Sequence, residues 1–207
     1  ERQQINKYIQ RNVDFLRQAR RHHAIKTGTL QERKRNEMEQ YFDKIAANDP
    51  EITDVEIVGN NRFLSLNQEE KVKSGAAFEN NTHVTTLQMS TLKLDCKFAV
   101  ALAKSLESNS TIERVLLDSN AIADEGLSAI MASMSKNSTV IELQIRHQSK
   151  PTSSATEDEL CDLLGGNTTL VKLGLDIRSQ LAKIKLDKKM AQNREIQRKA
   201  RVKANKK

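Results

Sequence analysis

Side chains that could perform chemistry are few and widely separated in this chain of 207 residues. The histidines lack Cys or carboxylate neighbours at the spacing of metal ligands; they are His22, His23, His83 and His147. Cys96 and Cys161 are isolated from each other, which favours two reduced thiols in an intracellular compartment. The sequence also has no phosphate-binding glycine loop and no nucleophile motif. We therefore expect no enzymatic activity, no metal and no cofactor.

A short sequence motif, here called the phrase, recurs along the chain. Asn is followed by two residues, an apolar residue, two residues, an apolar residue, one residue and an apolar residue. The copies begin at Asn48, Asn81, Asn109, Asn137 and Asn167. A strand core of this form, recurring about every 28–33 residues, is typical of leucine-rich repeats, in which each unit is one strand and one helix.

The phrase predicts an α/β fold, a leucine-rich-repeat solenoid of the ribonuclease-inhibitor type with about five strand–helix units, a parallel sheet and flanking terminal helices. Val115 and Leu143 should be fully buried at the centre of the sheet. Capping boxes are expected at Asn67–Glu70 and Thr156–Glu159. Each repeat Asn should adopt a left-handed conformation just past a helix end.

Residues between the inward positions should form the concave binding face. They are Asp54, Glu56, Thr86, Gln88, Arg114, Leu116, Glu142, Gln144 and Lys172. We expect Leu116, exposed beside Arg114, to be the strongest candidate for an interface centre.

Charge is segregated along the chain. Residues 1–40 hold ten Lys/Arg against five Asp/Glu, 41–181 hold thirteen against twenty, and 182–207 hold eleven against two. We expect a basic helical extension at 1–28, a capping helix at 29–47, the solenoid at 48–177 and a closing helix with a basic tail at 178–207. Leu181, Ile184 and Met190 should cover the last repeat.

The basic ends should bind an acidic surface, because their cations are too concentrated to be needed for packing. The candidates are Arg17, Arg20, Arg21, Arg194, Arg198, Lys199 and Arg201. The ends contain few aromatic residues, so we do not expect a nucleic-acid partner. No segment is long and apolar enough to span a membrane.

From about residue 41 to 204 the sequence resembles the C-terminal leucine-rich-repeat domain of the tropomodulin and leiomodin family. The resemblance lies in Asn48-Asp49-Pro50 before the first strand, in Gln148-Ser149 with Pro151, and in the basic tail from Asn193. It implies a cytoplasmic, cytoskeleton-associated module that binds actin at filament pointed ends, with tropomyosin as a further partner. The family's aromatic pair after the last strand is replaced by Leu175-Asp176.

Two functions remain open at this point. One is a non-catalytic, tropomodulin-like protein that binds actin. The other is a structural scaffold subunit of a microtubule-based, axonemal or other large assembly, anchored to neighbouring subunits through its basic helical ends.

Overall fold

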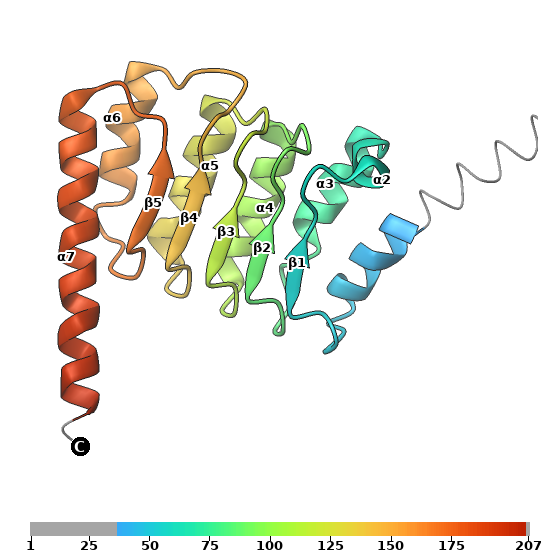
Figure 1. Ribbon diagram of the computed structural model, residues 1–207, viewed down its shortest axis with the longest axis horizontal. Helices are drawn as coiled ribbons and strands as arrows, with labels where there is room; N and C mark the ends of the chain where they lie inside the picture. The colour runs from blue at the N-terminus through green and yellow to red at the C-terminus, as the bar shows by residue number, and fades with distance from the viewer. Residues whose placement is uncertain (1–36, 206–207) are drawn as a thin grey trace, which may run out of the picture. The chain divides into compact units, whose positions relative to one another are not determined.

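Parallel strands follow one another across a single sheet in chain order (Figure 1). The computed structural model describes residues 37–205, and in this range the sheet has five strands. They are β1 (Asp54–Glu56), β2 (Thr86–Gln88), β3 (Arg114–Leu116), β4 (Glu142–Ile145) and β5 (Lys172–Leu175). The predicted extension at 1–28, with Arg17, Arg20 and Arg21, lies outside the described residues.

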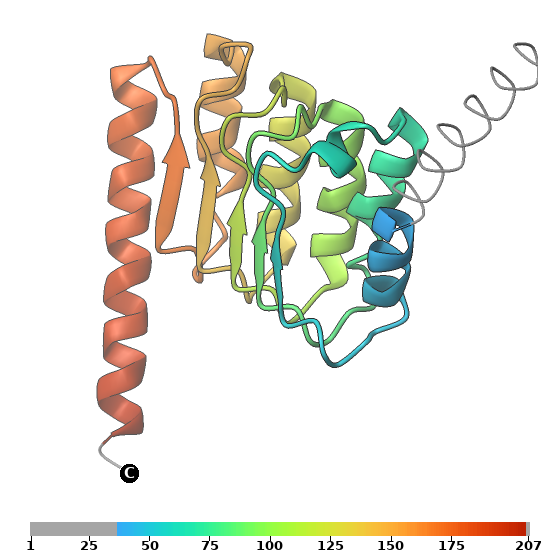
Figure 2. The ribbon, with the colours of Figure 1, turned by 45° about the vertical axis from the view of Figure 1, so that its right-hand side comes forward.

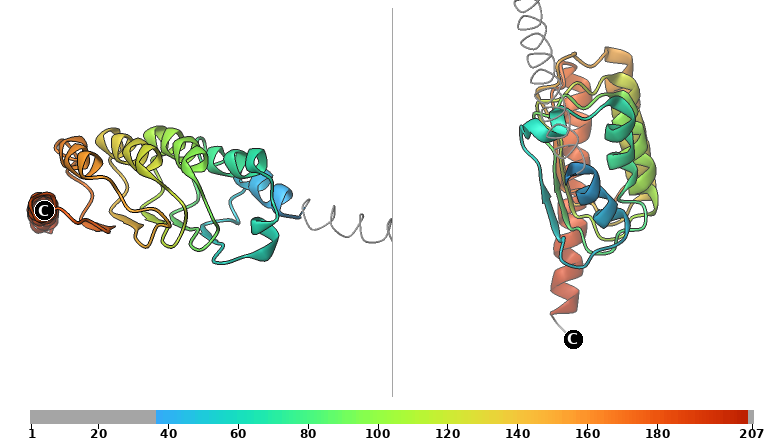
Figure 3. Two further views of the ribbon diagram at one scale, coloured as in Figure 1. Left: turned by 90° about the horizontal axis from the view of Figure 1, so that it is seen from above. Right: turned by 90° about the vertical axis from the view of Figure 1, so that its right-hand side faces the viewer.

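Helices connect the strands, and all of these except the short α2 lie on one face of the sheet, as the view from above shows (Figure 3). They are α2 (Asn61–Leu64), α3 (Gln68–Ala76), α4 (Cys96–Ser108), α5 (Asp124–Lys136) and α6 (Ser154–Leu163). Each of the longer ones turns an apolar stripe toward the strands; in α4 that stripe contains Phe98, Leu102 and Leu106. The result is a two-layer unit with one aliphatic core between helices and sheet.

Equivalent residues of neighbouring units stack directly on one another. Leu87 pairs with Val115, Val115 with Leu143, and Leu143 with Leu173. Val115 and Leu143 have no exposed surface, so both predictions for the sheet centre are confirmed. Because a single unit cannot bury its own strand, this stacking is what makes the short strands stable.

Of the two predicted capping boxes, one is confirmed and the other is wrong. Asn67 caps α3, and its side chain and that of Glu70 form the reciprocal capping box that the sequence predicted. The box at Thr156 is wrong. Ser153 is the N-cap of α6, its Oγ accepts from the backbone N of Thr156, and Thr156 is itself inside the helix.

With one exception, the repeat asparagines do not have the left-handed backbone conformation that the sequence predicted. Only Asn48 is left-handed, with φ of 61°. Asn109 and Asn137 follow helix ends with an extended backbone, at φ of −67° and −77°. Their conformation is set by side chains that turn inward, where they are 5% exposed.

These inward side chains form a ladder that crosses the units. Asn137 Nδ2 donates to the carbonyls of Leu106 and Asn109 at 2.7 and 3.0 Å, and Asn137 Oδ1 accepts from the backbone N atoms of Thr139 and Val140. Asn109 and Asn167 repeat the pattern one unit away on either side. Each amide therefore satisfies backbone groups of two units at once.

The two ends of this unit are covered differently. At the start, a helix over 37–46 places Phe42 against Phe63 and Phe78, with ring centroids 5.8 and 6.3 Å apart. At the other end a single long helix, α7 (Gln180–Ala204), runs beside β5 and continues past the sheet (Figures 1 and 2).

Candidate protein-binding surfaces

The strand face opposite the helices carries most of the predicted binding residues. In its second half three of them pair with one another rather than facing solvent independently. Glu142 lies between Arg114 and Lys172, at 3.2 Å from the Arg114 Nε and 2.5 Å from the Lys172 Nζ. Partial burial alone would raise the pKa of Glu142, but the hydrogen bonds and charges of Lys172, Gln144 and Arg114 outweigh it and lower that pKa below its ordinary 4.5.

The remaining predicted residues of this face differ in accessibility. Gln144 is only 7% exposed, because its side chain lies over Gly174 of the neighbouring strand. It therefore has little surface to give a partner. Leu116, predicted to be an exposed interface centre, is half-buried, as are Thr86 and Gln88. Asp54 and Glu56 on β1 are exposed. The proposed binding role of this face stays a prediction.

The inner side of α7 attaches to the start of the β5 segment by hydrogen bonds. Asn193 Nδ2 donates to the Leu170 carbonyl at 2.7 Å, Arg194 Nη1 to the Val171 carbonyl at 3.0 Å, and Gln197 Nε2 to the Thr169 carbonyl at 2.8 Å. The Val171 carbonyl corresponds to the Ile141 carbonyl, which accepts from the backbone N of Lys172, so it is a group that a further strand would satisfy in a longer sheet. Asn193 and Gln197 were missed by the sequence analysis.

The start of α7 is held by a buried carboxylate that the sequence analysis also missed. Glu157 of α6 is 1% exposed and accepts from the backbone N of Arg178 at 2.9 Å and of Ser179 at 2.7 Å. This fixes the phase of the helix. Ala182, Leu186, Met190 and Asn193 are turned inward, whereas Leu181 and Ile184 are 60% and 55% exposed. The prediction that Leu181 and Ile184 cover the last repeat is wrong.

The predicted cations of the tail fall into three groups. Arg194 donates a hydrogen bond to the Val171 carbonyl at the sheet edge, so the expectation that it is not needed for packing is wrong. Arg198 forms a two-pronged ion pair with Glu195, at 2.8 and 2.9 Å, and Lys199 lies 3.7 Å from the same carboxylate. The Arg198 hydrogen bond holds the pKa of Glu195 below its ordinary value. Arg201 is exposed and forms no ion pair within residues 37–205.

The outer face of α7 combines apolar and cationic side chains. Helical spacing places these residues on one side: Leu181, Ile184, Lys185, Lys188, Lys199 and Val202. All six side chains are exposed, and the exposed fraction of Val202 is 44%. Exposed aliphatic residues flanked by cations on a rigid helix are typical of a protein-binding surface.

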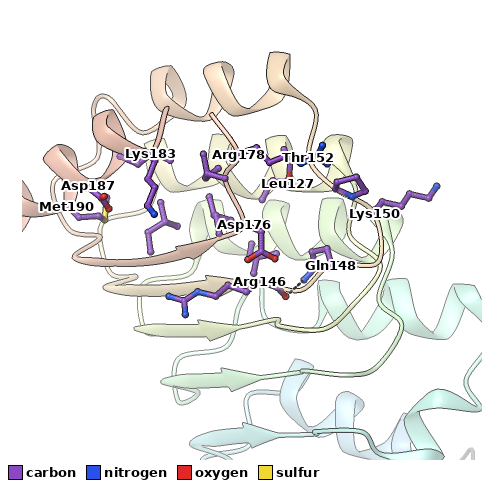
Figure 4. Close-up of a pocket in the computed structure, with 16 residues that line it drawn as sticks. Leu127, Arg146, Gln148, Lys150, Thr152, Asp176, Arg178, Lys183, Asp187 and Met190 are labelled. Carbon is purple, nitrogen blue, oxygen red and sulfur yellow. Dashed lines mark hydrogen bonds between the residues drawn. The ribbon is translucent and has the colours of Figure 1, made fainter. Parts of the chain in front are cut away.

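A groove lies on the other side of α7, between this helix, the ends of β4 and β5, and the loop that follows β4 (Figure 4). Its volume is about 690 Å³. In the described part of the chain no cluster of three or more His, Cys, Asp or Glu side chains could hold a metal ion. No helix there is both long and apolar enough to cross a membrane.

The unit architecture is shared with proteins of known structure. A solved structure described as leiomodin-1 actin-binding site 2 matches with a TM-score of 0.75 and 30% identity, over 80% of this chain and 94% of that chain. The tropomodulin C-terminal domain of Caenorhabditis elegans matches with a TM-score of 0.72 at 17% identity, over 79% of this chain and 97% of that one. The fold is thus a leucine-rich-repeat solenoid domain, as predicted.

Sequence comparison defines the family. A model of the TMOD/LMOD leucine-rich domain matches residues 34–196. Leiomodin-1 of Rattus norvegicus is 32% identical over 165 residues, which are 80% of this chain and 27% of that protein; leiomodin-2 of Homo sapiens is 30% identical over 169 residues, 82% of this chain and 30% of that protein. The chain belongs to the tropomodulin and leiomodin family and spans less than a third of the length of these two relatives.

Proposed function

We propose that this chain is a non-catalytic, cytoskeletal actin-binding module. One observation carries the proposal: the structural match to leiomodin-1 actin-binding site 2 covers nearly all of that site at 30% identity. A solenoid of this kind offers extended surfaces rather than an enclosed pocket, which suits binding to a large assembly. The alternative of a microtubule-based scaffold subunit gains no support from these relatives.

We assign the central contact to the outer face of α7. Leu181 and Ile184 are the most exposed large apolar side chains in the described residues, and Lys185 and Lys188 lie beside them. An apolar centre surrounded by cations suits an acidic protein surface such as that of actin. The exposed charges predict that binding weakens from low to physiological ionic strength.

Co-sedimentation with actin filaments tests this assignment. Leu181→Ser with Ile184→Ser should weaken filament binding about tenfold or more, as loss of an interface centre does. Both residues are exposed, so the melting temperature should stay unchanged. Val100→Ser is the matched control, because Val100 is also exposed, at 41%, but lies on α4. Wild-type binding to microtubules with no binding to actin would contradict the proposal.

Pointed-end activity and tropomyosin are narrower versions of the same proposal. Elongation from filaments blocked at their barbed ends measures the first. Co-sedimentation with bare and tropomyosin-coated filaments measures the second. A chain that binds filament sides equally well with and without tropomyosin, and leaves pointed-end growth unchanged, would restrict the function to side binding.

A further inference from the structure

The last of the five repeats is the one in which the inward residues of the strand are not fully buried. Leu143 has no exposed surface and Ile145 only 2%, and the corresponding residues of β2 and β3 are equally buried. Leu173 and Leu175 of β5 are half-buried. The cause is the position of α7, whose side chains bond the carbonyls of residues 169–171 and leave the far half of β5 uncovered.

This uncovered half forms the floor of the groove beside α7. Leu173 and Leu175 supply its accessible apolar surface, and the buried side chains of Ile145, Leu186 and Met190 line it. Side chains from β4, β5 and α7 surround one space, whereas the Lys150 side chain on the loop after β4 extends away from it (Figure 4). An apolar floor of this kind accepts aliphatic side chains of a ligand.

The rim of the groove has the opposite charge to the rest of the repeats. Four cations line it, namely Arg146, Lys150, Arg178 and Lys183, against the two carboxylates of Asp176 and Asp187. All four cations are exposed, and none forms an ion pair within residues 37–205. Residues 41–181 as a whole carry a net charge of −7, from thirteen Lys/Arg and twenty Asp/Glu. A local cationic rim on an acidic body selects an acidic ligand.

The outer edge of β5, which adjoins the groove, has backbone groups that could form hydrogen bonds with a ligand. Lys172 donates its backbone N–H to the Ile141 carbonyl of the β4 segment, so alternation along a parallel strand turns the backbone groups of Leu173 and Leu175 to the outer edge. In the described residues no hydrogen bond from α7 reaches either of them, whereas α7 does bond residues 169–171. An open edge is a template for one more strand.

We propose that the groove binds an extended acidic segment of a protein partner, which pairs with the outer edge of β5 and places alternate aliphatic side chains on the floor. Main-chain pairing would supply affinity, and the apolar floor and cationic rim would supply selectivity. The groove and the outer face of α7 lie on different sides of that helix. Hence this inference does not depend on the proposed actin contact.

Fluorescence polarisation with a designed probe tests it. The probe is a short fluorescein-labelled peptide in which Glu or Asp alternates with Val or Leu. We expect saturable binding that weakens as salt is raised. Arg178→Glu with Lys183→Glu should weaken it about tenfold or more, because two attractions become repulsions. Lys97→Glu with Lys104→Glu is the matched control, since it changes the charge equally at exposed positions of α4.

Two further probes isolate the proposed contacts. A peptide with Lys in place of each acidic residue should not bind. A peptide N-methylated at alternate backbone positions should bind about tenfold more weakly or worse, because it cannot pair with the strand edge. The inference is overturned if the acidic peptide fails to bind, if the basic peptide binds as well, if N-methylation has no effect, or if both charge-reversal pairs act alike. Actin co-sedimentation of the same variants reports separately on the outer face of α7.

Discussion

The two ends of the solenoid are covered by different kinds of contact. The first end buries aromatic rings: Phe42 of the opening helix packs against Phe63 and Phe78. The last end uses polar side chains of α7, which bond three consecutive carbonyls beside β5. Apolar packing closes a surface completely, whereas hydrogen bonds fix a helix at a few points and leave a groove beside it. The comparison teaches that the last end can combine a structural role with recognition.

The asparagine ladder gives the largest expected difference between the interior and the last end. Asn137→Ala removes five hydrogen bonds, four of them to backbone groups, and leaves buried backbone groups of two units without a partner, which should cost about 4 kcal/mol of unfolding free energy. Asn193→Ala should cost about 1 kcal/mol, because it removes one strong bond and also an Oδ1 that has no partner. Urea unfolding measures both, and equal losses would contradict the comparison.

The apolar side of the comparison is tested by Phe42→Ala and Met190→Ala. Phe42 is 6% exposed within an aromatic cluster, so its truncation should cost about 3–4 kcal/mol. Met190 borders the groove, is 5% exposed and has a smaller side chain than Phe42, so its truncation should cost about 2 kcal/mol. Chemical denaturation provides the measurement. A costlier Met190→Ala would mean that the last end depends on apolar packing as much as the first.

Truncations of α7 separate its structural part from its tail. A chain ending after Met190 loses Asn193, Arg194 and Gln197 and should be destabilised by about 2–3 kcal/mol, from three lost bonds to carbonyls. A chain ending after Lys199 keeps them and should melt at the wild-type temperature. Weaker actin binding by this second chain would assign a role to the distal tail; unchanged binding would confine the contact to the first turns of α7.

The smallest effect concerns the charges on the strand face. The pKa of Glu142 is lowered in the folded state, so its contribution to stability is present above the ordinary value of 4.5 and is lost as pH falls through the lower folded pKa. Because Lys172 is largely exposed, the contribution should be only about 0.5 kcal/mol. Lys172→Met should flatten the acid limb of stability against pH, and an unchanged limb would show that the pair contributes nothing.

Sequence periodicity was sufficient to predict the strands, their order and the burial of Val115 and Leu143, because each follows from one repeated phrase. It was insufficient for α7. The set Leu181–Ile184 and the set Ala182–Leu186–Met190 both have helical spacing, and the choice depends on Glu157 fixing the start of the helix. Asn193 follows Asn167 by 26 residues, close to the repeat period, but it lies on a helix without the strand phrase.

The surfaces were harder to predict than the fold. Alternation along the strands placed Gln144 on the open face, but only the neighbouring Gly174 determines that Gln144 lies flat and covered. The pairing of Glu142 with two cations likewise requires three strands in register. The groove has no local signal in the sequence, since it results from the position of α7 beside β5.

The asparagine ladder has a direction, and this bears on how the chain is made. Each Asn from the second unit onward donates to carbonyls of the unit before it, never to those of the unit after it. During translation, the acceptors for a repeat are therefore synthesised before the Asn that needs them. Stacking can advance with the emerging chain, one repeat at a time, so that each new unit adds to a surface already formed.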